Sequence, residues 1–144
     1  MTAQSPANAP DTVDSEYEDL LGQWSDLESA LSVLLARPRS VQDFAFKLRQ
    51  CDRWLQDLVA HDIDAALYLM FQLAATSSVG YSAAHALVCA TLGHILGHEL
   101  RLPVQERDSL VRAAFTMNLA MTALQDELAQ QREPLTPAQR SAVD

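Results

Sequence analysis

The feature that most constrains the fold is a row of large apolar residues with helical spacing near the N-terminus. The row recurs every three or four residues and consists of Leu20, Leu21, Trp24, Leu27, Leu31, Leu34 and Leu35. This spacing places all of them on one face of an α-helix. Similar patterns continue along the chain, and no β-type alternation of useful length interrupts them. The sequence therefore predicts an all-α helical bundle of about five to six helices.

Local capping patterns predict where the first helices begin and end. Residues 1–14 have proline steps and acidic residues without apolar periodicity, which predicts a disordered acidic N-terminal tail. Ser15 and Glu18 fit a capping box at the start of the first helix, and Pro38 ends it. Ser40 is expected to cap the second helix. Its apolar stripe is interrupted near Cys51-Asp52.

The later boundaries follow from the same reasoning. His61-Asp62 breaks the pattern, and Asp62 or Asp64 is expected to cap a third helix. A fourth helix is expected from about Ser82 to Arg101, and Pro103 opens a fifth that continues through residues 113–121. Thr136 to Gln139 fits a capping box for a short last helix. These boundaries divide the chain into an N-terminal helical segment, residues 15–75, and a second helical region, residues 76–144.

Composition excludes several classes of function. The 144 residues suffice for one domain, and 49% of them are hydrophobic. A net charge of −9 argues against nucleic acid or an anionic membrane as a partner. The longest apolar run, residues 65–71, is far shorter than the roughly 20 residues of a membrane span. With no secretory signal and only Cys51 and Cys89 as thiols, a cytoplasmic location is expected.

The fourth predicted helix carries His85, Cys89, His94 and His98. At about 100° per residue, His85 and Cys89 share one face, and His94 and His98 share nearly the opposite one. One four-ligand metal site is therefore excluded. We expect His85 and Cys89 to point inward, beside an apolar face formed by Val88, Leu92, Ile95 and Leu96. His94 and His98 are expected to be surface or interface residues, with a zinc pair completed by a third ligand as the alternative.

Four segments in order resemble the first half of an HD-GYP domain, a branch of the HD superfamily of metal-dependent phosphohydrolases. They are Tyr81–His85, Gly97–Pro103, Ala113–Met121 and Glu133–Gln139. The resemblance implies an HD-domain-like fold for residues 76–144 and gives His85 the place of the first metal ligand. Met117 and Asn118 stand at the His-Asp positions, and Ala120 and Met121 at the Gly and Lys positions.

The substitutions change what the resemblance implies about chemistry. Met117 is a soft neutral donor and Asn118 has no charge, so neither replaces an imidazole and a carboxylate around Mn or Fe. We therefore expect a catalytically degenerate HD-GYP-like domain, without a cofactor, that serves as a regulatory or protein-interaction module in bacterial signalling. Its partner would be a protein or a second copy, bound through apolar helical surface.

Two alternatives remain open from the sequence. In the first, the chain is the N-terminal part of a longer phosphohydrolase, similar to a cyclic di-GMP phosphodiesterase, whose other ligands for Mn, Fe or Zn lie beyond Asp144. In the second, it is a helical homo-oligomeric adaptor unrelated to HD proteins. The second would be preferred if the fold did not bring His85 beside Met117-Asn118.

Overall fold

The computed structural model describes the backbone of residues 10–144 and the side chains of residues 14–144. The described residues contain no strand, and the prediction of an all-α bundle is confirmed. The elements are α1 (Pro10–Ala36), α2 (Phe44–His61), α3 (Ile63–Thr76), α4 (Tyr81–Glu99), α5 (Val104–Thr116), η1 (Leu119–Met121, a 3-10 turn), α6 (Thr122–Gln130) and α7 (Pro137–Val143).

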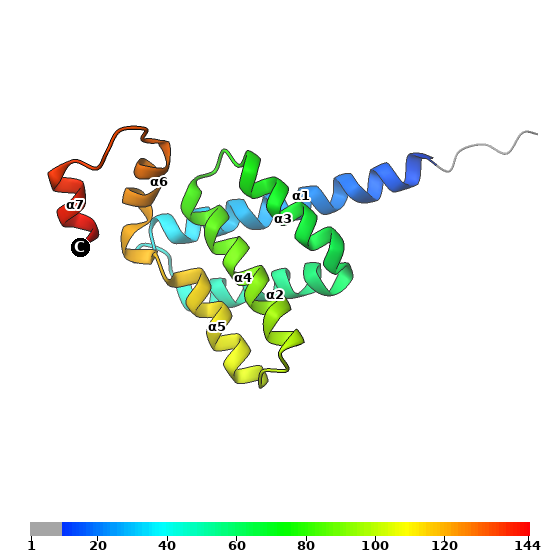
Figure 1. Ribbon diagram of the computed structural model, residues 1–144. Coiled ribbons are helices and arrows are strands. Elements are labelled where there is room, and N and C mark those ends of the chain that lie inside the picture. Colours follow the sequence, from blue (N-terminus) through cyan, green and yellow to red (C-terminus); the bar gives the residue numbers. More distant parts are fainter. Residues whose placement is uncertain (1–9) are drawn as a thin grey trace, which may run out of the picture.

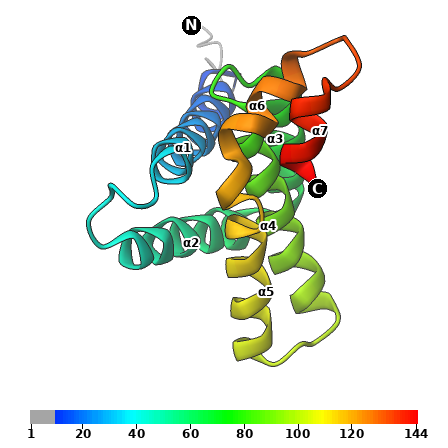
Figure 2. The same ribbon diagram turned by 90° about the vertical axis from the view of Figure 1, so that its left-hand side faces the viewer.

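Helix α4 is the centre of the bundle. It packs most extensively along α5 and also contacts α1, α2, α3 and α6. Figure 1 shows α4 and α5 side by side, while the first turns of α1 project beyond the other helices. In Figure 2, α1 and α2 diverge from the loop that joins them. One buried cluster extends from Trp24 on α1 to Phe115 on α5, so both predicted regions share a single core.

The apolar row on α1 supplies a large part of this core. Leu27 and Leu31 are fully buried, and Trp24 is 1% exposed. Burial of each such side chain contributes roughly 1.5–3 kcal/mol. The row predicted from the sequence is thus the face that holds α1 to the bundle.

Small residues on α4 let α5 approach closely. A Cβ atom added to Gly93 would lie 3.4 Å from Cγ2 of Val111, and one added to Gly97 would lie 2.9 Å from Cγ of Arg107. The added atom would make an ordinary contact at Gly93, whereas at Gly97 it would displace the aliphatic stem of Arg107. The close contact between α4 and α5 therefore depends on glycine at position 97 of α4.

Two predicted helix starts were wrong. Helix α1 already includes residues 10–14, so Ser15 is not its cap; the rest of the predicted tail, residues 1–9, lies outside the described residues. Helix α2 begins at Phe44 rather than after Ser40. The backbone N–H of Ser40 donates to the Arg37 carbonyl at 3.0 Å, which closes a turn, and the chain enters α2 through Asp43 in the left-handed region (φ 55°).

The predicted fifth helix is divided. Helix α5 ends at Thr116, and the chain turns through Asn118 (φ −110°, ψ 18°) into η1 and then α6. Asparagine has a low helix propensity, which is consistent with a break at this point. The division adds α6 to the predicted elements and removes Met117-Asn118 from a regular helix.

Other predicted boundaries are confirmed. Helix α1 ends at Ala36, before Pro38. Asp62 caps α3 by accepting a hydrogen bond from the backbone N–H of Ala65 at 3.0 Å. The capping box of α7 is complete, because Thr136 and Gln139 each accept a backbone N–H from the other.

Candidate functional site

His85 lies on the partly exposed side of α4. Its ring stacks on Tyr81 with centroids 5.3 Å apart, and its Nε2 is 3.7 Å from Sγ of Cys89. The helix places His85 roughly 80° around from Gly93 and roughly 120° around from Gly97, the two glycines that contact α5. His85 and Cys89 are both partly buried, so neither side chain lies fully inside the core.

The degenerate motif residues lie at the break between α5 and α6. Met117 is 50% exposed, Ala120 is exposed, and Asn118 and Met121 are half-buried. Met117 and Asn118 line a cavity of only about 10 Å³, together with Ser82 and Ala86 of α4. His85 does not line this cavity.

These residues do not provide the donors that a divalent-metal centre needs. His85 is the one imidazole at the motif positions, and a thioether and an amide are poor substitutes for the others. Within residues 14–144, no group of three or more His, Cys, Asp or Glu side chains is placed to hold a metal ion.

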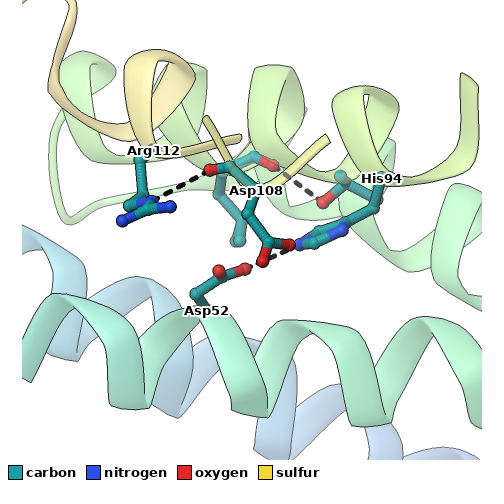
Figure 3. Close-up of polar contacts among 6 residues, drawn as sticks. Asp52, His94, Asp108 and Arg112 are labelled. Carbon is teal, nitrogen blue, oxygen red and sulfur yellow. Dashed lines mark hydrogen bonds and ion pairs between the residues drawn. The ribbon is translucent and has the colours of Figure 1, made fainter. Parts of the chain in front are cut away.

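The structure instead places His94 in the core. His94 is 6% exposed, and its Nε2 donates a hydrogen bond of 2.6 Å to Oδ1 of Asp52 on α2. Figure 3 shows the two side chains pointing toward each other between α2 and α4, with Asp108 and Arg112 of α5 in the same view. The prediction that His94 is a surface residue was wrong.

The sequence patterns did not indicate this pair, because Asp52 and His94 lie on different helices and each pattern covers one helix. In the sequence, Asp52 interrupts the apolar stripe of α2, although Cys51 and Leu55 beside it are buried. His94 was assigned away from the core because the larger apolar residues Ile95 and Leu96 follow it. A buried carboxylate is stable only when it is paired, so a charged residue within a buried stripe indicates a partner on another helix.

His94 also lines a pocket between α2, α4 and the start of α5, which we call the His94 pocket. Its volume is about 240 Å³. The lining residues are Gln56, Val59, Ala60, Ile63, His94, Ile95, His98, Glu99 and Arg107. His98 is exposed at its rim, where its Nδ1 lies 3.9 Å from Oε1 of Glu99. His94 and His98 therefore face one pocket, but Nε2 of His94 is already engaged by Asp52.

A second concave surface lies between the C-terminal half of α1, the connecting segment and α2; we call it the α1–α2 groove. Its volume is about 660 Å³. The lining residues are Ala30, Val33, Leu34, Ser40, Val41, Gln42, Lys47, Gln50, Cys51 and Trp54. Val33 on the outer side of α1 is 69% exposed and supplies apolar surface to the groove.

Basic residues are concentrated in the stretch of chain that forms one side of this groove. Five of the ten Lys and Arg residues of the chain fall between residues 37 and 53, and all five are exposed. They are Arg37, Arg39, Lys47, Arg49 and Arg53. Of the two acidic residues in the same segment, Asp43 is exposed and Asp52 is buried against His94. Of these basic side chains only Lys47 is among the residues that line the groove, and no acidic residue lines it.

The two thiols are poorly suited to nucleophilic chemistry. Burial raises the pKa of Cys51, and the neighbouring Asp52 carboxylate raises it further. Burial also raises the pKa of Cys89. Because the thiolate is the reactive form, both side chains are less reactive than an ordinary exposed cysteine.

One buried carboxyl group has no role in either concave surface. Glu28 on α1 is 2% exposed, and its Oε1 has no hydrogen-bond partner. Burial raises the pKa of Glu28, and the neighbouring Ser77 side chain opposes part of that rise. In the sequence, Glu28 follows Leu27 within the apolar row of α1.

Comparison with known proteins adds no assignment. No protein-family model, curated protein or solved structure matches the chain. None of the described helices combines the length and apolar character needed to cross a membrane. The resemblance to HD-GYP domains therefore depends on the sequence motifs alone and stays a prediction.

Proposed function

We propose that this protein is a non-catalytic helical interaction module whose α1–α2 groove binds an acidic amphipathic helix of a partner protein. The observation that carries the proposal is the groove itself, an apolar concavity with Val33 and Trp54 on its walls and Lys47 at its edge. Helices commonly bind by laying an apolar face into such a groove. The narrower expectation, a degenerate HD-GYP-like regulator in bacterial signalling, is a further proposal that the motifs alone support.

The charge distribution favours an acidic partner. The exposed residues between 37 and 53 include five basic and one acidic side chain. Opposite charge on an incoming helix would steer its approach and fix its orientation, while the apolar contacts supply most of the affinity. The same charges would repel a basic helix with an identical apolar face.

The groove is large enough for a row of side chains rather than a whole domain. Its volume of about 660 Å³ lies within the roughly 300–1,000 Å³ of sites that enclose small ligands. A helix would therefore insert a few aliphatic side chains beside Val33 and Trp54, and its polar face would stay in water.

The test uses two designed helical peptides that share one leucine stripe and carry either glutamate or lysine on the polar face. Trp54 lines the groove and the other of the two tryptophans, Trp24, is 1% exposed, so a change in fluorescence reports on the groove. The glutamate peptide should bind at least about tenfold more tightly, and added salt should reduce the difference. Equal affinities would contradict the charge argument.

Two matched variants locate the binding surface. Val33→Asp places a charge in the groove, whereas Phe71→Asp changes a side chain on α3 that is 54% exposed and does not line it. Only Val33→Asp should weaken peptide binding. If the protein instead shows a concentration-dependent mass by light scattering that Val33→Asp abolishes, the groove binds a second copy and the partner proposal is wrong.

A further inference from the structure

The His94 pocket contains an arginine without a partner. Nε of Arg107 is buried and has no hydrogen-bond acceptor. The ion pairs among residues 14–144 are His94–Asp52 and His98–Glu99, and neither includes Arg107. Arg107 as a whole is only partly buried and lines the pocket, so the terminal nitrogens of its guanidinium group, which form no ion pair among residues 14–144, can donate to an anionic oxygen.

Gly97 fixes the position of this arginine. A Cβ atom at residue 97 would lie 2.9 Å from Cγ and 3.2 Å from Cδ of Arg107. The aliphatic stem of Arg107 therefore lies against the backbone of α4, in space that any other residue at 97 would fill. Because the stem is already held in place, less conformational entropy of the Arg107 side chain is lost when a ligand binds.

The rest of the pocket is mainly apolar. Val59, Ile63 and Ile95 line it, and His94 is held by its bond to Asp52. No hydrogen bond to Nδ1 of His94 forms within the described part of the chain. A volume of about 240 Å³ is below the roughly 300–1,000 Å³ typical of drug-sized ligands, so the occupant must be small.

One carboxylate at the rim opposes an anionic ligand. Glu99 is 70% exposed and lies beside His98, so water and salt screen its charge. The Asp52 carboxylate lies behind His94 and accepts its hydrogen bond. Arg107, being more shielded and unpaired, has the larger effect on a group placed inside the pocket.

We propose that the His94 pocket is a binding site for a small monocarboxylate with a short apolar tail. The carboxylate pairs with Arg107, and the tail packs against Val59, Ile63 and Ile95. This site is separate from the α1–α2 groove, and the proposal does not depend on the proposed function.

The test is a titration of the full chain with hexanoate, followed by amide chemical shifts in NMR spectra, with hexanamide as the uncharged probe of the same shape. Hexanoate should bind saturably and shift the amides of residues 56–63, 94–99 and 107. Hexanamide should bind at least about tenfold more weakly, because it lacks the charge that pairs with the guanidinium. Equal binding of the two probes, or no saturable binding of hexanoate, would overturn the proposal.

Three variants then assign the binding to Arg107. Arg107→Gln should weaken hexanoate at least about tenfold, whereas Arg112→Gln, an exposed arginine on the same helix, should leave it unchanged. Gly97→Ala keeps the charge but displaces the arginine stem, so it should also weaken binding. Unchanged affinity in Arg107→Gln, or shifts confined to the α1–α2 groove, would contradict the assignment even if Gly97→Ala failed to fold.

Discussion

Separating Asp52 from His94 should reveal how strongly the bundle depends on one buried pair. The side chains are 10% and 6% exposed and their bond is 2.6 Å long, so neither partner can turn to water without opening the α2–α4 contact. His94→Leu would leave the Asp52 carboxylate buried without a donor. Breaking a buried pair from one side costs about 3–5 kcal/mol, a large part of the roughly 5–15 kcal/mol that stabilises a domain.

Replacing both partners should cost much less than the sum of the single changes. Asp52→Ala alone leaves an imidazole N–H without an acceptor, at about 1–3 kcal/mol. In the double variant no unpaired group remains, and the main cost is a small cavity. We therefore expect a coupling free energy of at least about 2 kcal/mol between the two positions.

The measurement is urea unfolding followed by helical ellipticity, with the free energy of unfolding extrapolated to water for the four members of the cycle. His98→Leu and Asp57→Ala are the matched controls, because both residues are exposed on the same two helices. Each control should change stability by no more than about 0.5 kcal/mol. A loss below about 1 kcal/mol in His94→Leu, or strictly additive effects, would refute the reasoning.

Two further predictions concern a buried acid and two glycines. Because burial raises the pKa of Glu28 above its usual 4.5, the ionised form destabilises the fold as pH rises through the raised value. Glu28→Gln should therefore be more stable than the wild type at neutral pH, with a gain that disappears below about pH 4.5 in denaturant titrations; a gain independent of pH would contradict this. Gly22→Ala, with nothing within 4 Å of the added Cβ, should stabilise the middle of α1 by about 0.5–1 kcal/mol. Gly80→Ala should destabilise, because Gly80 has φ 131° and the Cβ would lie 2.9 Å from Oδ2 of Asp126; equal melting temperatures for the two glycine variants would count against this account.

Large apolar residues predicted the fold well where they form the packed face. Trp24, Leu27 and Leu31 recur at helical spacing, and that spacing alone identifies the inner side of α1. Asp62 and Thr136 were equally predictable, because a cap depends on residues only three positions away. The sequence therefore predicts a helix face or a helix cap correctly when the residues that decide it lie within a few positions of one another.

The orientation of α4 could not be predicted in this way. Its buried face is made of small residues such as Ala90, Gly93 and Gly97, while Leu96 is 54% exposed. Small residues are buried there because α5 approaches closely, and that approach is visible only once both helices are in place. The prediction assumed that the largest apolar residues of α4 form its inner face. On that assumption His85 points inward and His94 points outward.

The candidate sites were hidden for a related reason. Each requires side chains brought together from at least two helices, as Asp52 and His94 are, and no spacing within one helix indicates such a meeting. The resemblance to HD-GYP domains predicts a site at His85 and Met117-Asn118. In the structure, His85 stacks on Tyr81 and does not line the small cavity that Met117 and Asn118 line.

Helix α2 connects the two concave surfaces, which gives a way to distinguish their roles. Cys51 and Trp54 line the α1–α2 groove, Gln56 and Val59 line the His94 pocket, and Asp52 of the same helix accepts the hydrogen bond of His94. If α2 moves as a rigid element, a carboxylate in the pocket alters peptide affinity at the groove only when it shifts the whole helix. Coupling of this kind must be reciprocal, so the peptide would change hexanoate affinity by the same factor. The double Asp52→Ala and His94→Leu variant removes the polar link between α2 and α4 while leaving every groove residue in place. Because His94 also lines the pocket, loss of coupling in that variant would identify the buried pair as the connection only if both peptide affinity and hexanoate affinity are retained.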